Sequence, residues 1–121
     1  MPRKILDESH IHHAIRETVS EHHAGIVREV QEAIAANAVV IVGMRQNPMP
    51  KYARKILDRD GIAYKYLEYG SYFGGWRRRT ALKMWTGWPT FPMVFVKGVL
   101  VGGAADLARL HASGELKKLL G

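Results

Sequence analysis

The chain has 121 residues, a formal net charge of +7 and no cysteine. Its length suits one domain with a substantial core, and no apolar run approaches the roughly 18 residues that a membrane span requires. The lack of cysteine excludes disulfides, thiolate nucleophiles and cysteine-ligated metals within this chain. We expect a cytoplasmic protein whose positive charge favours anionic partners.

The segment from residue 8 to residue 36 has the pattern of a helix. Its apolar side chains recur at spacings of about four, at Ile11, Ile15, Val19, Ile26, Val30 and Ile34. Gly25 interrupts this pattern, so the segment forms either one long helix or two. The apolar stripe exceeds what a short domain helix must bury. We therefore predict an N-terminal helical extension over residues 1–21 and a homodimer formed through it.

The same segment is rich in histidine, with residues His10, His12, His13, His22 and His23. His10 and His13 are three apart, so they would share a helix face as metal ligands. A solvated polar face is the alternative, and we favour it because no cysteine or well-placed carboxylate completes a site. We therefore expect no bound metal.

The middle of the chain has the pattern of a strand, a helix and a second strand. Residues 38–43 are a continuous apolar run, which is typical of a strand buried on both faces. A loop over residues 44–50 leads to an amphipathic helix over residues 51–60, with Pro48 or Pro50 in its first turn. A second strand is expected over residues 63–69. This order implies a right-handed parallel crossover.

The last third supplies a further helix, a hairpin and two short helices. The helix covers residues 76–85, the hairpin strands cover residues 93–96 and 99–101, and the short helices cover residues 104–110 and 115–120. We expect the tryptophans in the core or in a groove wall: Trp76, Trp85 and Trp88. The whole pattern predicts an α/β fold with a four-stranded mixed sheet flanked by helices.

Several strings in this order resemble the glutaredoxin family, within the thioredoxin-fold group. W-P-T-F-P, then V-K-G-V-L-V-G-G, then A-A-D-L-A-R-L-H-A-S-G-E-L is most similar to the monothiol branch. The resemblance covers residues 22–121, which we take as a glutaredoxin-like domain. It implies a cis peptide bond before Pro92 and a glutathione-binding groove beside it.

The main departure from the family is the loss of its active-site cysteines. Where glutaredoxins have C-x-x-C or C-x-x-S, this chain has Asn47-Pro48-Met49-Pro50. Asn47 stands at the nucleophile position and Pro50 at the resolving position. Thiol–disulfide exchange requires a thiolate, so we reject glutaredoxin catalysis and iron–sulfur binding. We expect the helix start to keep its partial positive charge, with no thiolate to stabilise.

The resemblance also implies which residues would hold glutathione: Arg45, Arg79, Lys83, Phe91, Pro92, Gly103, Ala104 and Asp106. Arg79 and Lys83 are four apart on a helix and would approach one carboxylate. Phe91 would pair through its backbone N–H and C=O. Gly103 and Ala104 would offer N–H groups to the other carboxylate.

Three positions depart from the family pattern around this groove. Met44 replaces a basic residue, for which the adjacent Arg45 would substitute. The family's first acidic residue falls on Ala105, and Asp106 matches the second, so the role of Asp106 stays open. The loop over residues 70–75 is longer than usual, which would reshape one wall.

We therefore expect a non-redox protein without a cofactor. It would bind glutathione or an acidic extended peptide, or act as an interaction adaptor, in the cis-Pro groove. One alternative is a nucleic-acid-binding module using Arg77, Arg78 and Arg79, although no nucleic-acid motif accompanies them and a solvated helix face is an equal alternative. Another is a non-thiol glutathione-dependent enzyme using Ser71, Tyr72 or a histidine.

Overall fold

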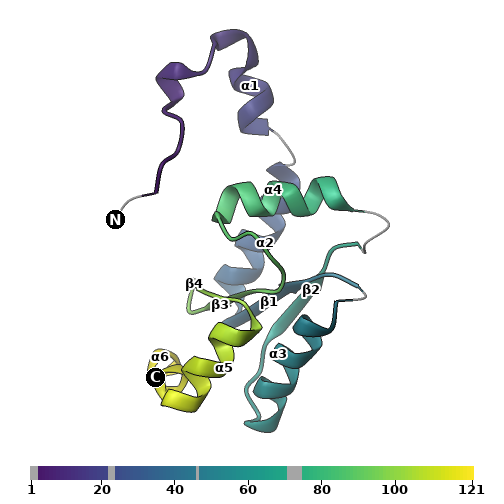
Figure 1. Cartoon of the computed structure of the whole chain (residues 1–121), viewed down its shortest axis with the longest axis vertical. Coiled ribbons are helices and arrows are strands. Elements are labelled where there is room, and N and C mark those ends of the chain that lie inside the picture. Colours follow the sequence, from purple (N-terminus) through teal and green to yellow (C-terminus); the bar gives the residue numbers. More distant parts are fainter. Residues whose placement is uncertain (1–2, 22–23, 46, 71–74) are drawn as a thin grey trace.

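The computed structural model describes residues 3–21, 24–45, 47–70 and 75–121. Figure 1 shows the elements in chain order: η1 (Glu8–His10), α1 (His13–Glu21), α2 (Ala24–Ala36), β1 (Val39–Gly43), α3 (Pro48–Arg59), β2 (Lys65–Glu68), α4 (Trp76–Thr86), β3 (Met93–Val96), β4 (Val99–Gly102), α5 (Ala104–Ser113) and α6 (Glu115–Leu120).

The four strands form one mixed sheet in the order β2-β1-β3-β4. β1 pairs with β2 in parallel, as the predicted crossover requires, and β3 pairs antiparallel with both β1 and β4. All five residues of β1 are buried, which explains its continuous apolar sequence. The predicted α/β fold with a four-stranded mixed sheet is confirmed.

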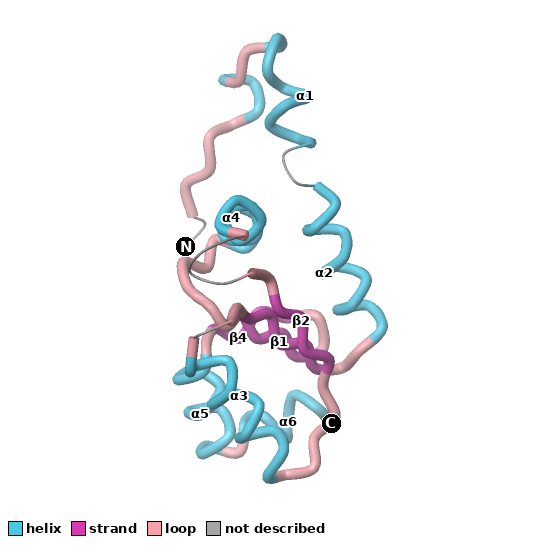
Figure 2. The backbone as a smooth tube through the Cα atoms, turned by 90° about the vertical axis from the view of Figure 1, so that its right-hand side faces the viewer, coloured by secondary structure: helices cyan, strands magenta, loops and turns pink. Residues whose placement is uncertain are grey.

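Helices cover both faces of the sheet, so the domain has two cores. Figure 2 shows the sheet edge-on, with α2 and α4 on one side and α3, α5 and α6 on the other. Successive side chains of β1 alternate between them, because Val40 and Val42 join the core under α2 and α4 while Val39 and Ile41 join the core under α3 and α5. The groove that forms the candidate site lies where these layers meet at one end of the sheet.

Two predicted boundaries need correction. α3 begins at Pro48 rather than at residue 51, because Asn47 caps it and Pro48 suits the first helical position. β2 covers Lys65–Glu68 rather than residues 63–69, because its pairing with β1 runs only from Val40 to Gly43.

The N-terminal elements stand apart from the two cores. Figure 1 shows η1 and α1 projecting beyond the sheet and its covering helices. Between α1 and α2, residues 22 and 23 lie outside the described chain. Arg3 returns to the end of α4, where its guanidinium donates a 2.7 Å hydrogen bond to the Thr86 carbonyl.

Candidate functional site

A groove of about 550 Å³ lies at the end of the sheet, among α3, α4 and α5. It collects short segments that are far apart in the sequence: the end of β1, the start of α3, one face of α4, the turn before β3 and the start of α5. Its lining residues are Met44, Asn47, Met49, Arg79, Lys83, Trp88, Pro89, Thr90, Phe91, Pro92, Gly103, Ala104, Ala105 and Asp106.

The turn before β3 forms one wall of this groove. Its Phe91–Pro92 peptide bond is cis, and both residues are buried. The Phe91 carbonyl accepts a hydrogen bond from Asn47 Nδ2 at 3.1 Å. In the part of the chain that the structure describes, no hydrogen bond uses the Phe91 N–H. The backbone edge expected here therefore keeps an open donor, while its acceptor already has one partner and one remaining lone pair.

Asn47 uses both ends of its side-chain amide. Its Oδ1 accepts from the Met49 N–H at 3.0 Å and so caps α3, while its Nδ2 reaches across the groove to Phe91. This contact joins residues 44 positions apart. The residue at the nucleophile position is therefore a structural connection between α3 and the cis-Pro turn.

The start of α3 lacks free backbone donors. Pro48 and Pro50 have no N–H, and the Met49 N–H between them is bonded to Asn47. A helix start normally leaves such N–H groups open to an anion. The first three helical positions of α3, where the sequence predicts a partial positive charge, therefore offer no backbone hydrogen bond to a ligand. Pro48 and Pro50 already indicate this lack of backbone donors in the sequence.

Arg79 and Lys83 both line the groove, but their environments differ. Arg79 is only 7% exposed, and its Nη1 donates a 3.0 Å hydrogen bond to the Tyr69 carbonyl at the end of β2. Lys83 is exposed, and its ammonium lies 5.8 Å from the centre of the Phe91 ring. Arg79 therefore braces the backbone, and Lys83 is the cation at the groove surface.

The other arginines of α4 point to different neighbours. Arg78 lies 4.0 Å from Glu29 and 5.2 Å from the centre of the Tyr69 ring, whereas Arg77 lies over the Trp76 ring. With Arg79 buried, the three do not form one continuous basic face. The arrangement gives no support to the nucleic-acid hypothesis.

The start of α5 is closed by Asp106. Its carboxylate accepts from the Gly103 N–H at 2.9 Å, which is the N3-to-N-cap half of a capping box, and it also pairs with Arg109. The Gly103 N–H is thus already occupied, and the N–H groups of Ala104, Ala105 and Asp106 are the other donors of this first turn. Asp106, whose role the sequence left open, both caps α5 and lines the groove.

Two predicted site residues lie outside the groove. Arg45 is exposed, and its Nε lies 4.0 Å from Glu68 of β2, away from the groove. It therefore does not take the place of the basic residue that the family has at the position of Met44. Pro50 is buried and lines an adjoining recess instead.

The tryptophans divide between groove, core and surface. Trp88 lines the groove and Trp85 packs against the core under α2 and α4. Trp76 is 61% exposed, so its predicted place in the core or a groove wall is wrong.

Several of the candidate hydroxyl and histidine residues lie outside the described part of the chain. Ser71, Tyr72, His22 and His23 lie outside them, as does most of the loop over residues 70–75. Within the described ranges, no group of three side chains is arranged to hold a metal ion.

The sequence matches the Glutaredoxin family model over residues 39–101. It is also 45% identical over 98 residues to a glutaredoxin-like protein of Dictyostelium discoideum, covering 81% of this chain and 80% of that protein. The chain belongs to the glutaredoxin family. Mitochondrial glutaredoxin-2 of Rattus norvegicus is 38% identical over 99 residues, which cover 78% of this glutaredoxin-family chain and 60% of the rat protein.

Solved glutaredoxin structures have the same fold. Oxidized glutaredoxin 2 from Chlamydomonas reinhardtii superposes with a TM-score of 0.70 at 29% identity, over 81% of this chain and 92% of that one. A buckwheat glutaredoxin–glutathione complex superposes with a TM-score of 0.72 at 25% identity, over 83% of this chain and 91% of that one. This family member departs from the thiol chemistry because it contains no cysteine.

Proposed function

We propose that this glutaredoxin-family protein binds glutathione, or an acidic extended peptide of similar shape, without thiol–disulfide exchange. Exchange needs a thiolate, and the chain has no cysteine to provide one. The observation that carries the proposal is that Lys83, Asp106 and the Phe91–Pro92 turn line one groove, in which an amide occupies the nucleophile position. The adaptor function would use this same groove.

The charges of the groove suit a zwitterionic peptide. Glutathione has two carboxylates, one ammonium and an extended backbone. Lys83 would bind a carboxylate, and the Phe91 N–H would bind a backbone carbonyl. Asp106 would bind the ammonium through the lone pairs that its bonds to Gly103 and Arg109 leave free. The buckwheat glutaredoxin–glutathione complex, a structural neighbour, adds support.

Calorimetric titration with millimolar glutathione tests this proposal. We expect weak, salt-sensitive binding, and a loss of about tenfold in Lys83→Ala, since a hydrogen bond to a charged group contributes about 1.5 kcal/mol. Lys117→Ala removes an exposed lysine outside the groove and is the matched control. Arg79→Ala is less informative because it also removes the bond to Tyr69. An absence of heat at millimolar glutathione contradicts binding of the tripeptide.

A mixed-disulfide reduction assay tests the non-redox part separately. We expect purified protein to show the same rate as buffer, because no residue can form the covalent sulfur intermediate. Turnover that persists after repeated purification would contradict this part of the proposal.

We also propose that residues 1–21 form an extension, distinct from the domain over residues 22–121, that joins two copies. Ile5, Leu6, Ile15 and Val19 are 71%, 66%, 52% and 47% exposed. The nine-residue α1 is shorter than helices that persist alone in water, so it gains most from an apolar partner.

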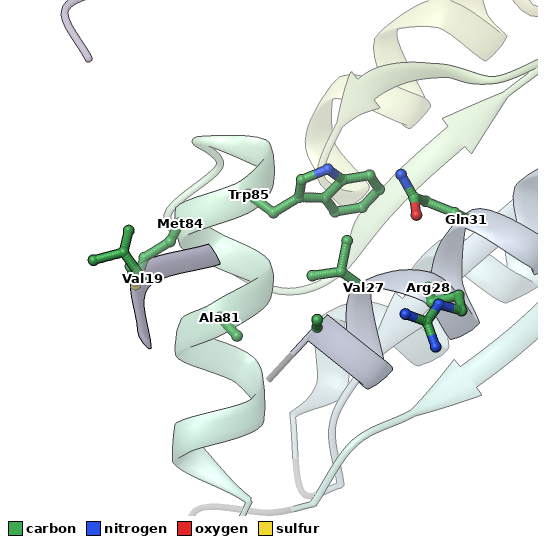
Figure 3. A pocket seen from close by; sticks show the side chains of 8 residues that line it. Val19, Val27, Arg28, Gln31, Ala81, Met84 and Trp85 are labelled. Atoms are coloured by element: carbon green, nitrogen blue, oxygen red, sulfur yellow. The ribbon is translucent and has the colours of Figure 1, made fainter. Parts of the chain in front are cut away.

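A groove lined by residues of α1, α2 and α4 offers the second copy a surface to pack against. Figure 3 shows it between α2 and α4, with Val27 and Trp85 on opposite sides, and Val19 of α1 at its edge. Its volume is about 380 Å³. Sedimentation should show a dimer that Val19→Glu converts to a monomer, while Thr18→Glu, an exposed polar site on α1, leaves the dimer intact. A monomeric wild type would refute this proposal.

The cellular location stays a proposal. None of the described helices is both long enough and apolar enough to cross a bilayer. We propose the cytoplasm on the basis of the sequence, and microscopy of a tagged protein tests it against mitochondria and plastids, which are named for some relatives.

A further inference from the structure

A second recess, of about 370 Å³, adjoins the cis-Pro groove on the other side of Asn47. It lies between the first two turns of α3 and the end of β2. Met44 and Asn47 line both hollows, so these two residues lie at the boundary between the groove and the recess. A ligand longer than a tripeptide would extend from one hollow into the other.

Two cations of α3 line the recess without an acidic partner. Lys51 is exposed, and Arg54, three residues later, is half-buried. The ion pairs found among the described residues include neither of them. Arg54 lies with its guanidinium carbon 4.3 Å from the centre of the Tyr66 ring, and this stacking holds the planar group in place.

The Arg54 guanidinium has also lost part of its hydration. Its Nε is shielded from water and has no hydrogen-bond partner within the described chain. A buried donor left unpaired is unfavourable. An incoming carboxylate would not reach the shielded Nε, but it would match the planar guanidinium and accept hydrogen bonds from the Nη groups, which are not among the shielded atoms.

The one carboxylate at this recess, Glu68, already has partners. It accepts a 3.2 Å hydrogen bond from the Tyr66 hydroxyl and lies 4.0 Å from Arg45. Burial, with Glu68 beside it, raises the pKa of Tyr66 to about 12, so the phenol keeps its proton and remains a donor. The local charge of Glu68 is therefore matched by Arg45, and Lys51 and Arg54 leave the recess net positive.

We propose that this recess binds an aspartate or glutamate side chain of an extended peptide whose adjacent residues occupy the cis-Pro groove. The inference rests on the proposed function and narrows it, because the preferred ligand becomes an acidic protein segment rather than a free tripeptide. Asp106 would receive the peptide's amino group through the lone pairs that its bonds to Gly103 and Arg109 leave free, and Lys51 and Arg54 would receive the peptide's acidic side chain.

Paired peptides test this inference on the full chain. One probe is Gly-Ala-Gly-Asp-Asp and the other is Gly-Ala-Gly-Asn-Asn, both with a free amino terminus and an amidated carboxyl terminus. Calorimetry should show about tenfold tighter binding of the Asp peptide to the wild type, as expected for one charge-assisted hydrogen bond. In Lys51→Ala and in Arg54→Gln this preference should fall toward one, while glutathione affinity stays unchanged.

Lys55→Ala is the matched control, because Lys55 is an exposed lysine of the same helix that does not line the recess. It should keep the tenfold preference. If the wild type binds the two peptides equally and also binds glutathione in a separate titration, the proposal for the recess is wrong and the proposal for the groove remains. An undiminished preference in Lys51→Ala, whose exposed site has no bearing on folding, would overturn the proposal for the recess as well. If the wild type binds neither peptide and no glutathione, both proposals fail.

Discussion

Asn47 offers the sharpest test of how this site is held together. Its side chain caps α3 through Oδ1 and ties the cis-Pro turn through Nδ2. Removing an N-cap costs about 1 kcal/mol, and losing one partly buried hydrogen bond costs about another 1 kcal/mol. Asn47→Ala should therefore lower the free energy of unfolding by about 2 kcal/mol. For a domain of this size, about 4 °C per kcal/mol converts this to a fall in Tm of about 8 °C.

Asn47→Ser separates the two contributions. A serine at this position still caps α3, but its shorter side chain does not reach the Phe91 carbonyl, so we expect a loss of only about 1 kcal/mol. Asn37→Ala is the matched control, because Asn37 is another half-buried asparagine at a helix end and donates to Ala33 of the same helix. It should lose about 1 kcal/mol without any effect on the groove.

Urea unfolding followed by circular dichroism and by tryptophan fluorescence measures these differences. If Asn47→Ser and Asn47→Ala are equally destabilised, the N-cap contributes nothing and the reasoning is wrong. If Asn47→Ser matches the wild type in stability, the tie to Phe91 contributes nothing and the reasoning is again wrong.

Three further predictions concern the ends of helices and strands. Gly102→Ala should cost more than about 2 kcal/mol in urea unfolding, because φ there is +114° and a Cβ would meet the carboxylate that caps α5. Burial and the hydrogen bond to Glu29 raise the pKa of Tyr69, so the stability from its neutral phenol is present below about pH 10 and declines above it. Tyr69→Phe should therefore be less stable than the wild type at pH 8, by a margin that shrinks at pH 11. The thiol pKa of the variant Asn47→Cys, measured from its alkylation rate as a function of pH, should be higher than that of the double variant Asn47→Cys/Pro50→Ala. The double variant regains a backbone N–H that stabilises the thiolate, and equal pKa values would contradict this.

The fold could be predicted from sequence because its signals are local. The apolar run of β1, the two-residue hairpin connection before β4 and the amphipathic α3 each reflect burial or backbone geometry within a few residues. The start of α3 could also be predicted from the sequence, since Asn47 before Pro48 is a helix-start signal, and Pro48 is one of the two prolines expected in the first turn. Sequence could not show where β2 ends, because that depends on its pairing with β1.

The groove was predictable as a set of residues but not as a set of contacts. A spacing of four placed Arg79 and Lys83 on one side of α4, yet only the fold shows that Arg79 lies buried against the Tyr69 carbonyl. Arg45 is the second residue after β1 and points toward Glu68, whereas Met44 before it lines the groove, because neighbouring positions at a strand end face opposite ways. The tie from Asn47 to Phe91 spans 44 positions, and no local pattern specifies such a contact.

The chemistry at the start of α3 has changed in two linked ways. A thiol is a weak donor and a weak acceptor, so cysteine at position 47 would neither cap α3 well nor hold the Phe91 carbonyl. An amide does both, with a distinct donor and a distinct acceptor. Pro48 and Pro50 then remove the donors that a thiolate would need, and the amide occupies the remaining one. Each change makes the other less harmful, because a site without a thiolate needs no donors and a site without donors does not favour a thiolate. The start of α3 is thereby joined to the cis-Pro turn by neutral hydrogen bonds, which persist whatever the redox state of the surroundings.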